Sequence, residues 1–268
     1  MISSKNRTIF ILLCFFYTLY MKQILALAGL LTLSCGEQTE ENQPEENNSS
    51  WEEIFPCNPK IQKYLSDSKI IISNYKEEIE KVIEENVRSD LQAVPPSEVI
   101  ELLLDDRIDI LCGKWREGRV PIPAAICKPF DEIIILNNPL FEKWALDYQI
   151  NGSILDHNLE FDQQTAEKII NERGIDGYHE MIRITKLIAN GIGALVHEYS
   201  HAAWYDNDIK YTHEKPPIDY SNDPFYQYGW KAKEAYLYLL IGQLNCFADE
   251  RYNYFGGNAE GCEEDQRR

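Results

Sequence analysis

The sequence predicts a mostly helical α+β fold, with one domain over residues 60–256 and a loose tail at 257–268. Two long segments, about 178–204 and 229–254, repeat apolar residues every three or four positions, which is typical of helices with one buried face. The aliphatic run Ile133–Leu136, closed by Asn-Asn-Pro, is typical of a buried strand. With 268 residues, of which 44% are hydrophobic and 12% aromatic, the chain can build the core of one ordinary domain.

The first 35 residues predict a targeting segment that lies outside the fold. Two basic residues precede an apolar run, and a second charged-then-apolar pattern begins at Met21-Lys22. Its apolar part is about ten residues long, the length of a signal-peptide core and too short to span a bilayer. It ends in Thr32-Leu33-Ser34-Cys35-Gly36, which resembles the lipobox of bacterial lipoproteins. That resemblance implies that Cys35 is lipidated and begins the mature chain.

Two interpretations of this segment stay open. Met21 is the expected true start if residues 1–20 are an upstream extension. The alternative is one hydrophobic anchor over 8–33, which Lys22 and Gln23 interrupt. The lipoprotein interpretation implies a location in the bacterial cell envelope, outside the cytoplasm, at the outer membrane or in the periplasm. Contact with the membrane is then expected through the lipid anchor only.

Residues 36–59 are predicted to form a disordered acidic tether. This stretch has seven Glu and no Lys, Arg or Asp, and most of the rest is Asn, Gln, Ser and Pro. Such a composition buries too little apolar surface to offset its ordering entropy.

The net charge of −18 argues against a nucleic-acid partner, because a phosphate backbone would be repelled. The seven cysteines include Cys14, in the upstream extension, and Cys35. Five cysteines then remain in the mature chain, which allows two disulfides and one free thiol outside the cytoplasm. These are Cys57, Cys112, Cys127, Cys246 and Cys262.

An amphipathic helix is predicted over 61–91, with a possible break near Ser66-Asp67-Ser68. Pro95-Pro96 end this segment. Ser97 is a plausible N-cap for a short helix through about Asp105.

The middle of the chain predicts shorter elements. Residues 119–129 are rich in proline and indicate a loop or an irregular strand. Helices are expected over about 139–146 and 165–172, the second stopped by Gly174. Residues 206–224 predict a polar loop long enough to shape a cleft.

The main helix contains Gly191 and Gly193, each of which costs about 1 kcal/mol relative to Ala in a helix interior. A helix that keeps both is expected to be approached closely by another backbone at this point. The second long helix is expected to end at Gly256-Gly257.

The chemistry of the chain is carried by Leu195-Val196-His197-Glu198-Tyr199-Ser200-His201-Ala202, which contains H-E-x-x-H. On a helix, two histidines four residues apart project from one face. Two such imidazoles are half of a tetrahedral zinc site, and Glu198 can reach a metal-bound water without being a ligand. Only five histidines occur in the chain, so a chance match is rare.

This motif, with a strand before it and a helix after it, resembles the zincin metallopeptidases over about residues 130–252. The resemblance implies a zincin-like catalytic domain with one Zn²⁺ bound by His197 and His201, and with Glu198 as the general base. Ile133–Leu136 would border the substrate cleft, where it could bind a peptide by strand addition.

The third ligand identifies the branch of zincins. The metzincin pattern needs Gly at position 204 and His or Asp at 207, and Trp204 and Asn207 exclude it. The gluzincin-like branch needs a Glu on a later helix, and Glu234, in Lys-Glu-Ala-Tyr, is similar to the E-A step of several gluzincins. The alternative is that Glu234 pairs with Lys231 or Lys233 on the surface.

Other candidate ligands remain open. They are Asp249 and Glu250 on the same helix and, more remotely, Asp206, Asp208 and His213. An oxyanion-stabilising residue is expected among Tyr228, Tyr252, Tyr254 and His213. His157 and His179 have no motif around them.

These features lead to the expectation of a zinc metallopeptidase that hydrolyses a peptide or protein substrate at the cell envelope. The alternative is a binding or structural lipoprotein that keeps a zincin-like fold without catalysis. A third option is zinc-dependent hydrolysis of an amide that is not a peptide.

Overall fold

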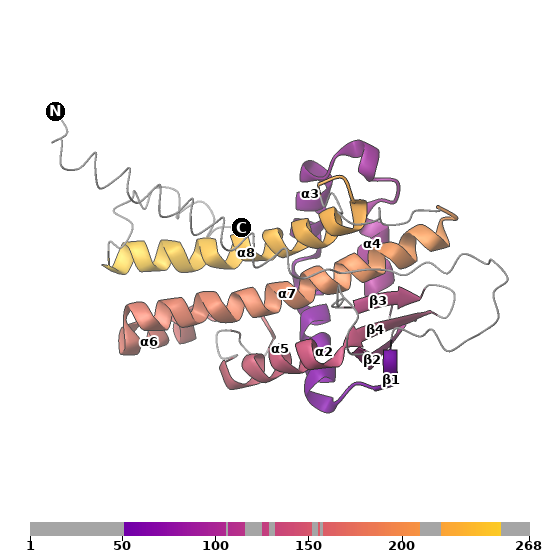
Figure 1. The fold of residues 1–268 in the computed structure, drawn as a ribbon. Helices are drawn as coiled ribbons and strands as arrows, with labels where there is room; N and C mark the ends of the chain where they lie inside the picture. The colour runs from indigo at the N-terminus through magenta and orange to yellow at the C-terminus, as the bar shows by residue number, and fades with distance from the viewer. Residues whose placement is uncertain are drawn as a thin grey trace, which may run out of the picture.

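The computed structural model describes residues 51–105, 107–115, 125–128, 132–151, 155, 158–209 and 221–252. They form a mostly helical α+β fold with one small sheet, as the sequence predicts (Figure 1). The elements in chain order are β1 (Trp51–Pro56), α2 (Pro59–Asn74), α3 (Lys76–Asn86), a 3₁₀ turn (Ser89–Leu91), α4 (Pro96–Leu104), β2 (Asp109–Trp115), β3 (Ala125–Lys128), β4 (Ile133–Asn137), α5 (Asn138–Asn151), α6 (Gln163–Arg173), α7 (Ile175–Asp206) and α8 (Pro224–Tyr252).

The sheet has the strand order β1-β2-β4-β3. β4 confirms the strand predicted at Ile133–Leu136, and its last four residues are buried. It pairs in parallel with β2 and antiparallel with β3, so hydrogen bonds occupy both of its sides. The expectation that a peptide adds to this strand is therefore wrong. β3 is the outermost described strand on that side, and it packs against α7.

The predicted tether extends too far toward the fold, because residues 51–59 are ordered. β1 pairs antiparallel with β2, with Phe55 opposite Cys112. The ring of Trp51 lies over Gly113, where a Cβ would be only 2.6 Å from it. An average over 36–59 conceals this strand, because its acidic residues are exposed while Trp51 is buried. Residues 36–50 lie outside the described part of the chain.

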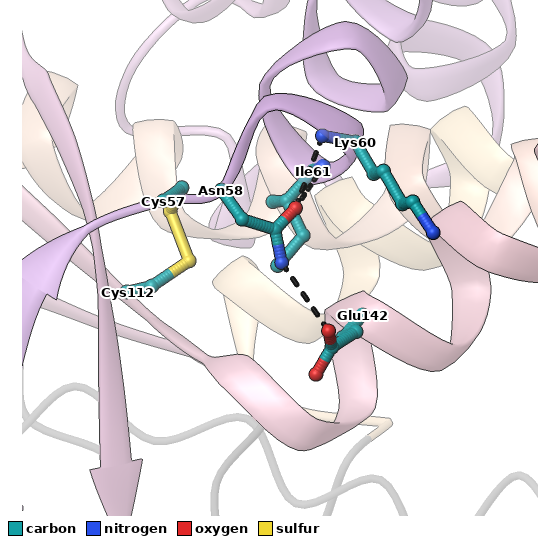
Figure 2. The surroundings of a disulfide bond; sticks show 6 residues. All are labelled: Cys57, Asn58, Lys60, Ile61, Cys112 and Glu142. Atoms are coloured by element: carbon teal, nitrogen blue, oxygen red, sulfur yellow. Dashed lines mark hydrogen bonds between the residues drawn. A yellow bond between two sulfur atoms is a disulfide. The ribbon is translucent and has the colours of Figure 1, made fainter.

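A disulfide joins the end of β1 to β2 (Figure 2). It links Cys57 to Cys112, which are 55 positions apart in the chain. The next residue, Asn58, caps α2: its Oδ1 accepts hydrogen bonds from the backbone N–H groups of Lys60 and Ile61, each at 3.0 Å. The disulfide and the cap thus fix the entry into α2. Cys127 is buried in β3.

The predicted first helix breaks at Tyr75, not near Ser66-Asp67-Ser68. Asp67 and Ser68 instead lie buried inside α2, where their polar atoms are bonded. The Asp67 carboxylate accepts from Tyr148 Oη of α5 at 2.9 Å, and Ser68 Oγ donates to the Tyr64 carbonyl at 2.8 Å. These polar residues can therefore continue a helix, because α5 supplies a partner for Asp67 and a carbonyl of α2 itself accepts from Ser68.

The other predicted helices are confirmed with altered ends. α4 begins at Pro96 and has Pro95 at its N-cap, so Ser97 does not cap it. α5 and α6 extend beyond the predicted 139–146 and 165–172. Residues 210–220 of the predicted loop lie outside the described part.

α7 and α8 run antiparallel, side by side, as the longest elements of the fold (Figure 1). The close approach predicted at Gly193 is confirmed, because a Cβ there would lie 3.0 Å from the carbonyl oxygen of Gly229. Gly191 instead makes room for a side chain, the Tyr64 phenol of α2. Within the described residues, no helix is both long enough and apolar enough to span a membrane.

Candidate metal site

His197, Glu198 and His201 lie on two successive turns of α7 and form one group that could hold a metal ion. One ligand atom from each residue lies within 4.8 Å of the others. The group follows from helical geometry, because residues i and i+4 share a face and residue i+1 is rotated by about 100° from residue i. The motif helix expected from the sequence is thus present, and it brings these three residues together.

The two imidazoles are spaced for a shared metal ion. The Nε2 atoms of His197 and His201 are 3.2 Å apart. Two metal–nitrogen bonds of about 2.1 Å across this gap make an angle of about 100°, near the tetrahedral value. The same distance also suits a hydrogen bond between one protonated and one unprotonated Nε2. The donor set, two imidazoles and a carboxylate, is one that zinc prefers.

The site is enclosed by the protein. His197 and Glu198 have no exposed surface and His201 is 7% exposed. Buried ionisable groups of this kind are retained where they bind a metal or a partner charge. The Glu198 carboxylate lies beside the ring of the first histidine, with Oε1 3.9 Å from His197 Nε2. It is therefore close enough to act on a molecule held by the imidazoles.

Residues of α8 form one wall of the site, and sequence reasoning missed them. The ring of Phe225 lies 3.6 Å from the imidazole of His201, and the ring of Tyr226 lies 4.7 Å from that of His197 (centroid distances). Gly229 packs directly against His197, since a Cβ there would be 2.9 Å from His197 Cβ and 3.4 Å from its backbone nitrogen. The second long helix was predicted to begin at about 229, so the aromatic pair lay ahead of it, whereas α8 begins at Pro224.

Glu234 does not join this group. Its carboxylate accepts hydrogen bonds from Trp230 Nε1 and, at 2.7 Å, from Lys231 Nζ. These partners are three and four residues away on α8, so the carboxylate is bound along its own helix. The structure thus matches the alternative interpretation, in which Glu234 pairs with Lys231.

The remaining candidate ligands do not lie with His197, Glu198 and His201, or their side chains are outside the described part of the chain. Asp206 pairs with Arg107, and Asp208 is exposed beyond the end of α7. The side chains of Asp249 and Glu250 lie outside the described residues, as do His213 and the predicted lipidation residue Cys35. Among the described residues, the group that can hold a metal consists of the motif residues alone.

Of the tyrosines considered for oxyanion stabilisation, Tyr228 is engaged elsewhere. Its hydroxyl is buried and donates to the carbonyl of Val94, ahead of α4. Burial raises the pKa of this phenol, and the nearby Glu98 carboxylate adds to the effect. Tyr252 and Tyr254 have no described side chain, and His157 also lies outside the description. His179 is exposed in the first turns of α7, far along the helix from the motif.

Comparisons with protein-family models, with curated proteins and with solved structures found no match to this chain. A functional interpretation therefore depends on the site itself, a buried His/Glu/His group on α7 that could hold a metal ion.

Proposed function

We propose that this chain is a zinc-dependent metallopeptidase that acts at the bacterial cell envelope. One observation carries the proposal: His197, Glu198 and His201 place a ligand atom each within 4.8 Å, in a buried site on one helix. Two imidazoles four residues apart on a helix supply two of the three protein ligands of catalytic zinc sites, and the adjacent Glu is the general base. A purely structural site has no need for a third, basic group at this position.

In this mechanism His197 and His201 would hold the ion, and Glu198 moves a proton. When bound, zinc would polarise the scissile carbonyl and lower the pKa of the attacking water to about 7. Glu198 accepts the proton of the attacking water and later passes it to the leaving amine. Burial of the site strengthens these electrostatic interactions, because little solvent screens them.

Among the described residues, no candidate for a third protein ligand joins the motif residues at the site. Glu234 is the ligand that the gluzincin resemblance implies, yet its carboxylate is bound to Trp230 and Lys231. Asp249 and Glu250 lie twenty or more residues beyond Gly229 on α8, about 30 Å along the helix axis, and are too far away to replace it. His213 is the remaining candidate in the proposal.

Burial of the site also favours a second candidate, a non-catalytic lipoprotein that keeps the motif for structure. His197 and Glu198 have no exposed surface, and the spacing of 3.2 Å between Nε2 atoms suits a direct imidazole–imidazole hydrogen bond. In this candidate the two rings stabilise α7 and no metal is needed.

Metal analysis combined with peptide cleavage separates the two candidates. The metallopeptidase should contain one zinc per chain and should cleave a mixed peptide library. Glu198→Gln should keep the zinc and lose cleavage by a factor of about 10² or more, because a general base typically contributes 10²–10⁴. Protein purified without chelator that has no stoichiometric zinc, and takes none up, would exclude the enzyme.

The third ligand has its own test. Glu234→Gln should keep zinc at the wild-type level, because the side chain is committed to Trp230 and Lys231. His213→Ala is the variant at the remaining candidate, and it should lower zinc affinity. Loss of zinc in Glu234→Gln alone would restore the gluzincin-like assignment.

Anchoring is tested apart from the activity. The proposal expects incorporation of labelled palmitate into the full chain in a bacterial host, and loss of the label in Cys35→Ser. A Cys35→Ser chain that still carries the lipid would refute lipidation at this cysteine.

A further inference from the structure

The first turn of α8 contacts the H-E-x-x-H face of α7 through two aromatic rings. Phe225 faces His201, with ring centroids 3.6 Å apart and planes tilted by 33°. Tyr226 meets His197 edge-on, at 4.7 Å and 62°. Both histidines of the candidate site therefore touch the same turn of the neighbouring helix.

Phe225 is also backed by a second ring of α7. Its centroid lies 5.1 Å from that of Trp204 in an edge-to-face contact at 69°. Trp204 lies three residues after His201, so the two side chains project from one side of the helix. The phenyl ring of Phe225 thus contacts both the imidazole and the indole, and it is itself 1% exposed.

The turn that carries Phe225 is fixed by a buried cap. Asp223 Oδ1 accepts a hydrogen bond from the Tyr226 N–H at 3.1 Å, and the Asp223 carbonyl accepts from the Gln227 N–H at 3.0 Å. Asp223 is 2% exposed. A capped first turn holds its side chains in one orientation, so the phenyl ring is a rigid surface for His201.

Ring orientation matters at this site because both ligand atoms are at the far end of an imidazole. Rotation of His201 about its Cβ–Cγ bond would carry Nε2 away from the position 3.2 Å from His197 Nε2. A phenyl ring packed against the imidazole at 3.6 Å, with its plane tilted by 33°, opposes that rotation. Hydrogen-bonding groups that orient metal ligands typically change metal affinity by 10–100-fold, and a ring that only restricts rotation should act at the low end of that range or below it.

We propose that Phe225 is a positioning residue that holds the His201 imidazole in its metal-binding orientation. This inference rests on the metal site of the proposed function. It assigns to the first turn of α8 a role that the H-E-x-x-H motif does not contain. The gain in zinc affinity comes from a ligand that is already oriented before the ion arrives.

The test compares Phe225→Leu with Tyr228→Leu in the full chain. Both replace a buried aromatic residue of the same turn, but the Tyr228 hydroxyl bonds to Val94, away from the histidines. Zinc affinity is measured by competition with a chromophoric chelator, and Co²⁺ absorption reports the ligand geometry. Phe225→Leu should weaken zinc binding by about 3- to 10-fold and alter the Co²⁺ spectrum. Tyr228→Leu should leave both as in the wild type.

Phe225→Met is the second ring-free variant, because its flexible side chain refills the space if the leucine variant does not fold. It too should bind zinc more weakly. Wild-type affinity in either folded variant, or equal weakening in Tyr228→Leu, would overturn the positioning role. A wild-type chain that binds no zinc would instead refute the proposed function, so the two failures are distinguishable.

Discussion

Gly193 and Gly229 face each other where α7 contacts α8, and neither position has room for a methyl group. A Cβ on Gly229 would lie 2.6 Å from the Gly193 carbonyl oxygen and 2.9 Å from His197 Cβ. Both distances are far shorter than a van der Waals contact between heavy atoms, about 3.5–4.0 Å. The glycine pair therefore sets the distance between the two helices beside the first histidine of the motif.

We expect Gly229→Ala to destabilise the protein by about 1–3 kcal/mol, because the added methyl group forces the two backbones apart. It should also weaken zinc binding, since the methyl group displaces His197. Chemical denaturation and zinc competition measure the two effects.

Gly242→Ala is the matched control on the same helix. No heavy atom lies within 4 Å of a Cβ there, so the substitution should be neutral or should stabilise by up to about 1 kcal/mol. Equal stability changes at the two positions would show that the interhelical contact is unimportant.

The Cys57–Cys112 disulfide should contribute about 4 kcal/mol to the free energy of unfolding, from the entropy of closing a loop of 55 positions. Reduction should therefore lower the midpoint of urea denaturation. Cys57→Ala/Cys112→Ala should start from that lower midpoint and respond no further to reductant. A double variant that reductant still destabilises would indicate another disulfide in the chain.

Two buried tyrosines should respond oppositely to loss of the hydroxyl group. Tyr64 Oη donates to the Leu187 carbonyl at 2.6 Å, so Tyr64→Phe should cost about 1 kcal/mol. The Tyr236 hydroxyl is buried without a hydrogen-bond partner among the described residues, so Tyr236→Phe should be neutral or stabilising. Thermal denaturation of the two variants in parallel measures this. A larger loss in Tyr236→Phe would mean that its hydroxyl has a partner.

The protein should lose stability in alkali. Burial raises the pKa of Tyr64, Tyr148, Tyr228 and Tyr236 above the ordinary value for tyrosine. A pKa that is raised in the folded state gives stability that is complete below about pH 10, the unfolded pKa, and is lost as the pH rises beyond it. Urea midpoints should therefore fall steadily above pH 10.

Phenolate absorbance checks the same prediction by a second route. The four buried tyrosines should ionise together with unfolding, as one cooperative rise in phenolate absorbance. Stability that stays constant through pH 11 would contradict the burial of these phenols.

Local patterns predicted the helical elements well, because each helix satisfies its own backbone hydrogen bonds and shows its buried face as a period of 3.6. The ends of α7 were within three residues of prediction, and the aliphatic run of β4 was recognised. α8 begins five residues before the predicted start at about 229, so its first turn was missed. β1 and β2 were not predicted. Their pairing joins residues more than fifty positions apart, and Trp51 is buried only because Gly113 leaves room for its ring.

The sequence by itself determined the group His197, Glu198 and His201, because a spacing of four residues on a helix decides which side chains share a face. Only the tertiary structure decided what surrounds them. Glu234 bonds to Lys231 along its own helix, while Phe225 contacts His201. The rotation of α8, and its close approach to α7 at Gly193 and Gly229, determine which side chains of α8 face α7. That choice depends on packing between residues distant in the chain, which no local pattern records.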